Sequence, residues 1–199
     1  MKIEQFISKV LALARIGQKY TQDEYARENY EELEKLAIET ISENAEIIFD
    51  HNIYIHDVYA TPNVSVRVLV FNEEGKLLMV KEKQDGLWAV PGGWCDVFES
   101  SSESGRKEVK QEAGLDVKIE RILGVFQRER YKDYPTLVSE YVHYYCASIL
   151  GGDLKHNHET LDVGFFDINE LPELSKKNTI MELTKAYQVY LNELPVQFD

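Results

Sequence analysis

Two glutamates four residues apart, Glu108 and Glu112, are the side chains of this sequence best placed to do chemistry. Their stretch predicts a helix, because residues 100 to 102 are serines that offer N-caps and Gly114 stands where a left-handed residue would end the helix. Residues four apart share one helical face, and Gln111 lies beside them. Two carboxylates held close together repel, and a hard divalent cation such as Mg2+ relieves that repulsion while keeping waters and substrate phosphates as its other ligands. The spacing therefore indicates a metal site that handles phosphate.

The same stretch resembles the Nudix box, in which Gly, Glu, Arg-Glu, Glu-Glu and Gly stand at fixed intervals. The positions in register are Gly93, Glu99, Glu108, Val109, Glu112, Gly114 and Leu115, after a typical Trp-Ala-Val-Pro-Gly-Gly lead-in at 88–93. Two positions depart from the motif. Lys107 replaces Arg, which keeps the charge but loses the two-pronged fork that would hold Glu99. Gln111 replaces the first Glu of the pair, so its amide oxygen could contact a metal without supplying negative charge.

The resemblance implies an α/β protein, a Nudix α/β/α sandwich with a mixed sheet. Period-two alternation and turn signals predict strands, and a Thr179 to Glu182 capping box predicts a terminal helix. A turn at residues 72–75 predicts that the first two strands form a hairpin. The predicted strands are 64–70, 77–83, 117–130, 138–147 and a short one ending at 166.

Residues 1–58 are predicted to form an N-terminal helical hairpin, and residues 59–199 the Nudix hydrolase domain. The first helix carries an apolar stripe and is expected to end near Gly17, and a capping box at Thr21 to Glu24 is expected to open the second. Two helices alone cannot bury both stripes, so the hairpin should pack on the main domain, on a second copy of the chain, or on both. A homodimer is expected, and a role in capping the substrate stays open.

The composition limits the classes of function. A chain of 199 residues with 44% hydrophobic residues can bury a core, and a formal net charge of −13 argues against a surface that coats nucleic acid. Two cysteines give no disulfide framework and favour a cytoplasmic location. No signal peptide and no membrane-spanning run are seen, so a soluble protein with a small-molecule partner is expected.

The Nudix resemblance also implies a reaction and its residues. Nudix hydrolases cut the pyrophosphate of a nucleoside diphosphate linked to another group, using Mg2+ or Mn2+. Carried over by register, Glu112 is the best candidate metal ligand, Glu108 is a ligand or base, and the carbonyl of Gly92 is a further ligand. Gln111 is the uncertain ligand, and its lost charge leads us to expect fewer bound metal ions.

Three positions outside the box are further candidates. In pyrophosphatases of the family an additional acid often comes from a late loop, where this chain has Glu159 and, as a second choice, Asp162. Either acid could equally be a solvated loop residue. Trp94 could stack on a base, and Arg128, on a predicted strand, could bind a diphosphate or merely pair with a surface carboxylate.

The hairpin followed by the Nudix box resembles a bacterial subfamily described as CDP-choline or ADP-ribose pyrophosphatases. We place CDP-choline slightly ahead of ADP-ribose as the expected substrate type. The alternative is a weakly active or non-catalytic nucleotide-binding module, because Gln111 and Lys107 depart from the box. A regulator of that kind often carries a basic DNA-binding helix, which the acidic hairpin does not offer. Hydrolysis of oxidised nucleoside triphosphates is a third possibility.

Overall fold

The chain divides into two compact units, Met1–Ala60 and Thr61–Asp199, which are considered separately. The computed structural model describes residues 3–43, 62–132 and 140–199. The predicted boundary at residues 58 and 59 lies outside the described residues. Among the described helices, none combines the length and the apolar character needed to cross a membrane.

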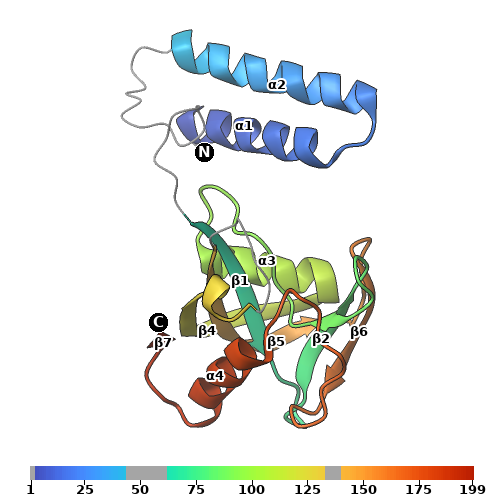
Figure 1. Ribbon diagram of the computed structural model, residues 1–199, viewed down its shortest axis with the longest axis vertical. Coiled ribbons are helices and arrows are strands. Elements are labelled where there is room, and N and C mark those ends of the chain that lie inside the picture. Colours follow the sequence, from blue (N-terminus) through green and yellow to red (C-terminus); the bar gives the residue numbers. More distant parts are fainter. Residues whose placement is uncertain (1–2, 44–61, 133–139) are drawn as a thin grey trace. The chain divides into compact units, whose positions relative to one another are not determined.

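The N-terminal unit is a pair of helices, α1 (Ile3–Tyr20) and α2 (Glu24–Glu43), which run side by side (Figure 1). Their shared core contains Ile7, Leu11 and Ala37, all buried. Alongside it, the guanidinium of Arg15 lies 2.7 Å from the carboxylate of Glu34. The predicted helical hairpin is therefore present. Its helices share a small apolar core and are joined beside it by the Arg15–Glu34 ion pair.

Two details of this hairpin differ from the prediction. The first helix continues past Gly17 to Tyr20, because Gly17 serves packing: a Cβ there would lie 2.4 Å from the Tyr30 ring. The second helix is capped by Asp23, whose side chain accepts a hydrogen bond from the N–H of Ala26 at 3.1 Å. A glycine in a helical stretch can mark close packing as well as a helix end.

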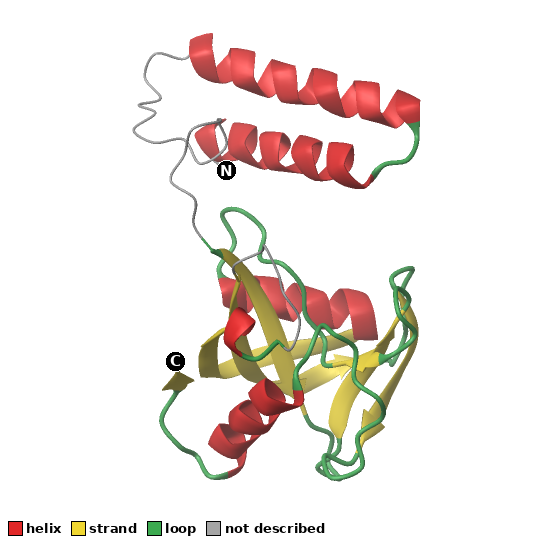
Figure 2. Cartoon of the chain, viewed as in Figure 1, coloured by secondary structure: helices red, strands yellow, loops and turns green. Residues whose placement is uncertain are grey.

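The second unit combines two sheets with α-helices packed against them (Figure 2). One sheet has the order β1 (Asn63–Val70), β5 (Glu140–Gly152), β4 (Leu115–Gln127) and β7 (Gln197–Phe198). Its β1–β5 and β4–β7 pairs are parallel and its β4–β5 pair antiparallel. The other sheet is antiparallel, with the order β3 (Trp88–Ala89), β2 (Leu77–Glu82) and β6 (Thr160–Phe166).

Two hydrophobic clusters cover opposite faces of the strands, because neighbouring residues of a strand point to opposite sides. One cluster packs helix α3 (Ser101–Ala113) against β1 and β2, and includes Val66, Val68, Leu78, Val80, Val109 and Ala113. The other packs helix α4 (Ile180–Leu191) on the opposite face, and includes Leu69, Met79, Leu123, Tyr144, Leu183 and Val189. The predicted α/β sandwich with mixed strand directions is confirmed.

The predicted hairpin of the first two strands is wrong. Strands β1 and β2 lie in different sheets. Among the described residues their backbones are joined only beside the turn, through the bridge between Phe71 and Leu77 and the hydrogen bond from the N–H of Asn72 to the carbonyl of Lys76. The far edge of β1 is taken by the glycine-rich turn, since the N–H groups of Val66 and Val68 donate to the carbonyls of Gly93 and Pro91, each at 2.9 Å. This pairing excludes β2 and fixes the turn beside the sheet.

Candidate active site

Helix α3 begins and ends where the sequence predicts. Ser100 forms a capping box with Glu103, accepting a hydrogen bond from its backbone while the Glu103 carboxylate accepts one from the N–H of Ser100. Gly114 ends the helix in the left-handed conformation, with φ 78°. These two ends fix the register in which Glu108 and Glu112 face the glycine-rich turn.

Glu112 lies directly against this turn. Its side chain is 2% exposed, and its Oε2 accepts a hydrogen bond from the N–H of Gly92 at 2.9 Å. Gly92 cannot be replaced freely, because its φ is 150° and a Cβ would come within 2.0 Å of the Val66 carbonyl. Glu108 lies beside the next residue, where a Cβ on Gly93 would be 2.7 Å from the Glu108 carboxylate. Both predicted carboxylates therefore meet the turn.

Burial and mutual repulsion act on both carboxylates. Burial raises the pKa of Glu112 to about 8, and the negative charges of Glu108 and Glu82 push it in the same direction. Burial also raises the pKa of Glu108, an effect that the nearby Arg67 opposes and the charge of Glu159 reinforces. Two acids arranged in this way hold their charge at an energetic cost that a bound cation would relieve.

The donor set suits a hard cation with few protein ligands. Among the described residues, no cluster of three or more His, Cys, Asp or Glu side chains has the geometry of a metal site. Two carboxylates and a neighbouring backbone carbonyl still match Mg2+, which is commonly bound through one or two carboxylates with water and substrate phosphates completing its shell. The residues present fit such an ion.

Lys107 takes over the task of the missing arginine. Its ammonium lies 2.7 Å from the Glu99 carboxylate and also binds the carboxylate of Asp96. The single ammonium of Lys107 thus contacts two carboxylates that precede α3. An arginine guanidinium would instead bind one carboxylate through two hydrogen bonds. The tie between Glu99 and the helix is kept despite this departure from the motif.

Glu159 and Trp94 have exposed side chains near the carboxylate pair. The Glu159 side chain is 59% exposed, and its charge reaches Glu108 as described above. Trp94 follows the turn directly, its backbone bridges to Ser65, and it is 48% exposed. Both positions are open to a ligand, as a base or a stacking surface requires.

Arg128 lies in a different environment from the one expected. It begins a short 3-10 helix, Arg128–Arg130, since strand β4 ends one residue earlier, and it is 5% exposed. Its guanidinium donates to Glu140 at 3.1 Å and to the carbonyl of Lys176 at 2.6 Å. With those donors engaged internally, the geometry favours a structural role for Arg128 over contact with a diphosphate.

Gln111 points to the outer side of α3. It is exposed and lines a shallow pocket of about 630 Å³ together with Lys107, Lys110 and Leu150. That pocket does not include Glu108 or Glu112. The amide is therefore not held against the two carboxylates in this conformation.

Sequence reasoning missed three charged residues near the pair, namely Arg67, Glu82 and Lys177. Arg67 and Glu82 are each 3% exposed, and Lys177 pairs with Glu82 at 2.7 Å. A charge inside an apolar strand was the available signal for Arg67 and Glu82. Lys177, in a loop next to another lysine, carried no local signal.

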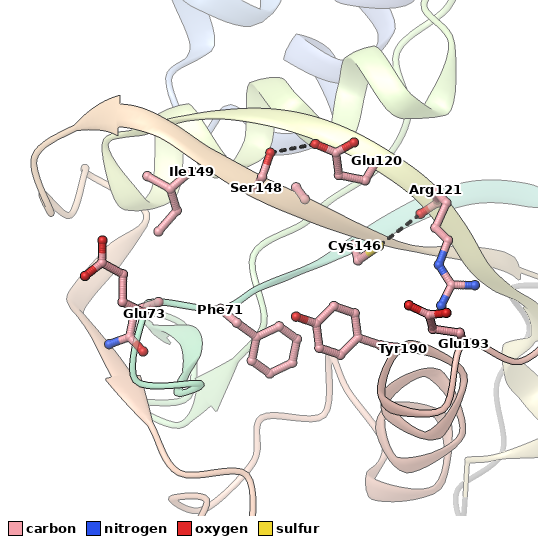
Figure 3. Close-up of a pocket in the computed structure, with 11 residues that line it drawn as sticks. Phe71, Glu73, Glu120, Arg121, Cys146, Ser148, Ile149, Tyr190 and Glu193 are labelled. Atoms are coloured by element: carbon pink, nitrogen blue, oxygen red, sulfur yellow. Dashed lines mark hydrogen bonds between the residues drawn. The ribbon is translucent and has the colours of Figure 1, made fainter.

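A second, larger pocket has a lining that includes none of these residues, and Figure 3 shows it. It has a volume of about 860 Å³ and is lined by residues of β4, β5, α4 and the turn after β1, among them Phe71, Arg121, Cys146 and Tyr190. The rings of Phe71 and Tyr190 stack with centroids 4.4 Å apart. None of the predicted site residues lines this pocket. The candidate site is therefore identified by its paired carboxylates and the glycine-rich turn, and not by the size of a pocket.

Comparison with known proteins decides the family. The NUDIX domain model matches residues 61–187. This chain belongs to the Nudix family. Its Nudix domain and its relatives make it a Nudix pyrophosphohydrolase, and the fold and resemblance inferred from the box are confirmed.

Several relatives of this Nudix chain carry substrate names. A Bacillus subtilis protein, YjhB, provisionally described as an ADP-ribose pyrophosphatase, is 34% identical over 90% of this chain and 88% of its own length. An ADP-ribose pyrophosphatase of Streptococcus suis is 36% identical with a TM-score of 0.62, covering 70% of this chain and all of that one. A UDP-X diphosphatase structure is 29% identical with a TM-score of 0.70, covering 98% of this chain and 96% of its own.

Proposed function

We propose that this chain hydrolyses the pyrophosphate bond of a nucleoside diphosphate linked to a second moiety, releasing a nucleoside monophosphate. The observation that carries the proposal is the pairing of Glu112 with the N–H of Gly92 at 2.9 Å, beside Glu108, in a Nudix chain. Relatives named for ADP-ribose and UDP-X, each covering 70% or more of this chain, support this substrate class. ADP-ribose thereby moves ahead of CDP-choline, which none of the relatives described above carries in its name.

We propose that Glu108, Glu112 and the carbonyl of Gly92 hold Mg2+ or Mn2+, whereas Gln111, exposed on the outer side of α3, adds no charge to the site. A bound ion of this kind lowers the pKa of its water and neutralises phosphate oxygens. The chain's own residues position it. The Gly92 N–H orients the Glu112 carboxylate, and the capped helix α3 sets the distance between the two glutamates.

Glu159 is our candidate for the group that receives the proton of the attacking water. Its exposed carboxylate sits on the loop after β5 and carries the charge that acts on Glu108. The loop is ordered by Asn157, whose Oδ1 accepts from the N–H of Glu159 at 2.8 Å. Trp94 is proposed to stack on the base.

The test is product analysis with a panel containing ADP-ribose, CDP-choline, a UDP-sugar and nucleoside triphosphates, each with Mg2+ or Mn2+. Wild type should release a nucleoside monophosphate and a phosphorylated second product. Glu112→Gln and Glu108→Gln should lower kcat by about 100-fold or more, as expected for loss of metal-dependent charge stabilisation. Glu170→Gln, on an exposed turn outside the site, is the matched control and should behave as wild type.

The replacement of Glu by Gln111 keeps a second candidate in view, a nucleotide-binding module with little turnover. Calorimetric binding of the same panel separates the two. Binding without product formation from any member would overturn the hydrolase proposal in favour of the binding module. Metal titration of Gln111→Glu would show whether the lost charge lowers the number of bound ions, and unchanged stoichiometry and affinity would contradict that idea.

A further inference from the structure

We propose that the ammonium group of Lys177, held by the buried carboxylate of Glu82, binds the diphosphate of the substrate. This inference rests on the proposed function and adds a residue outside the Nudix box. The ligand class is the anionic oxygens of a pyrophosphate linkage, whatever the nucleoside and leaving group.

The loop that carries Lys177 is fixed to the sheet by backbone hydrogen bonds. The N–H of Trp88 donates to the carbonyl of Glu173 at 3.0 Å, and the N–H of Ser175 donates to the carbonyl of Trp88 at 2.7 Å. Asn178 then accepts a hydrogen bond from the N–H of Val90 at 3.0 Å. The loop is thus attached to the segment leading into the glycine-rich turn, which brings Lys177 close to the part of the chain that contacts the carboxylate pair.

Two buried arginines also hold the loop. Arg67 donates from Nε to the carbonyl of Lys177 at 3.3 Å, and Arg128 donates to the carbonyl of Lys176 at 2.6 Å. Both arginines are at most 5% exposed. The position of the Lys177 backbone is therefore determined by the protein interior, and a side chain on such a backbone loses little entropy when it binds a ligand.

The carboxylate of Glu82 orients the side chain of Lys177. The Lys177 Nζ lies 2.7 Å from Glu82 Oε2, and the side chains are 35% and 4% exposed respectively. The other oxygen, Oε1, is buried and has no hydrogen-bond partner among the described residues. An ammonium has three donors, so at least one side of Lys177 stays available to a ligand at the protein surface.

The loop that carries this ammonium lies beside the proposed metal ligands, because Asn178 holds Val90 two residues before Gly92, the partner of Glu112. The positive charge of Lys177 is one of the smaller effects that oppose the rise in pKa that burial causes at Glu108 and Glu112. A diphosphate bound near these glutamates would find the Lys177 ammonium already oriented. No reorganisation of the protein would then be needed as negative charge develops on the phosphate. Lys177 acts here as a fixed point charge and exchanges no proton.

The experiment compares Lys177→Met with Lys177→Arg in the full chain. Loss of one charge-assisted contact predicts a fall in kcat/KM of about 10- to 100-fold for Lys177→Met, while Lys177→Arg should retain most activity. Affinity for ADP, measured by calorimetry with Ca2+, should fall by a similar factor. The control is Lys118→Met, which removes a lysine that pairs with a single glutamate, Glu120, at 3.0 Å away from the site.

A double variant separates binding from folding. Lys177→Met leaves Glu82 buried and alone, whereas Lys177→Met with Glu82→Met replaces the whole pair by apolar side chains, which is often neutral for stability. A double variant that folds like wild type and still binds ADP weakly supports the proposal. Recovery of wild-type affinity and kcat/KM in the double variant would overturn it, because the lysine would then serve only to neutralise Glu82.

The outcome for Lys177 is distinct from that for the proposed function. If wild type turns over substrate, and Lys177→Met has unchanged kcat/KM and ADP affinity, only the proposal for Lys177 is refuted. Absence of turnover by wild type on every substrate refutes the hydrolase proposal. In that case the ADP affinities still test the proposal for Lys177. Equal affinities of wild type and Lys177→Met for ADP would reject that proposal.

Discussion

Glu112 combines burial with a second carboxylate nearby, and both features act on its proton equilibrium. In the folded, metal-free state its pKa is about 8, against about 4.5 for an unperturbed glutamate. Between these values the folded state holds a proton that the unfolded state has released. Stability from this group is therefore complete below about pH 4.5 and is lost as the pH rises to about 8.

This loss of stability with rising pH can be measured. In EDTA, the free energy of unfolding of wild type should fall between pH 5 and pH 8 by an amount on the order of a few kcal/mol, since one pKa unit corresponds to about 1.4 kcal/mol. Glu112→Gln should show a flatter profile, and Mg2+ should restore wild type at pH 8 by binding the charged form. Urea unfolding at both pH values measures this. Parallel profiles for the two proteins would contradict the assignment.

Lys107 permits a test of the departure from the motif. Because its ammonium already bridges Glu99 and Asp96, Lys107→Arg should change stability and activity little. Lys107→Met should lower the free energy of unfolding by about 1 kcal/mol, the scale of a partly exposed charge network. Thermal unfolding provides the measurement, with Lys110→Met, which removes an exposed pair with Asp116, as control. A large gain in activity for Lys107→Arg would show that the lysine impairs the site.

At the level of elements, the end of α3 depends on a glycine that cannot take a side chain. Gly114 and Gly75 have nearly the same φ, 78° and 75°, but a Cβ on Gly114 would lie 2.3 Å from the Asp153 carbonyl, whereas Gly75 is in open space. Gly75→Ala should cost about 1 kcal/mol for the left-handed backbone. Gly114→Ala should cost about 1–3 kcal/mol more for the clash. Urea unfolding of both variants isolates the steric part, and equal losses would remove the clash from the explanation.

Elements fixed by local signals were predictable from the sequence, and those fixed by distant partners were not. The capping box of Ser100 and the stop at Gly114 are properties of adjacent residues, so α3 and the spacing of its glutamates followed directly. The pairing partner of β1 did not follow, because its edges are filled by β5 and by the turn near Gly93. A turn between two apolar runs favoured a hairpin that the tertiary structure overrides.

The same distinction applies to the candidate site. Glu108, Glu112 and Gly92 belong to one motif and were found together. Lys177 meets Glu82 across 95 residues of sequence, counted from 82 to 177, and no local pattern records that encounter. Arg128 was predicted on a strand, but the strand ends at Gln127 and the side chain turns into the interior.

At the level of the whole molecule, α1 presents a second apolar surface besides the one facing α2. Its members are Ile3, Phe6, Leu13 and Ile16, which are 55%, 51%, 61% and 49% exposed. Exposed apolar side chains at helical spacing are typical of an interface. We propose that they serve homodimer formation.

A dimer predicts a solution mass of twice 23.1 kDa, measured by light scattering after size exclusion. Phe6→Glu with Leu13→Glu should give the monomer mass, because two charges would be buried in an apolar contact. Leu191→Glu, at an exposed position at the end of α4, is the control and should leave the mass unchanged. A monomeric wild type would refute the homodimer.

The loop that carries Lys177 also has a consequence for the order in which this protein becomes active. Its ties reach back 110 residues to Arg67 and 88 residues to Val90, so they close only after almost the whole chain is available. Contacts of such sequence separation form slowly, because the entropy of closing large loops opposes them. During synthesis, helix α3 can present its two glutamates while residue 177 is still unmade. A nascent chain would therefore acquire its phosphate-binding lysine among its last steps, and refolding followed by activity should lag behind refolding followed by helix content.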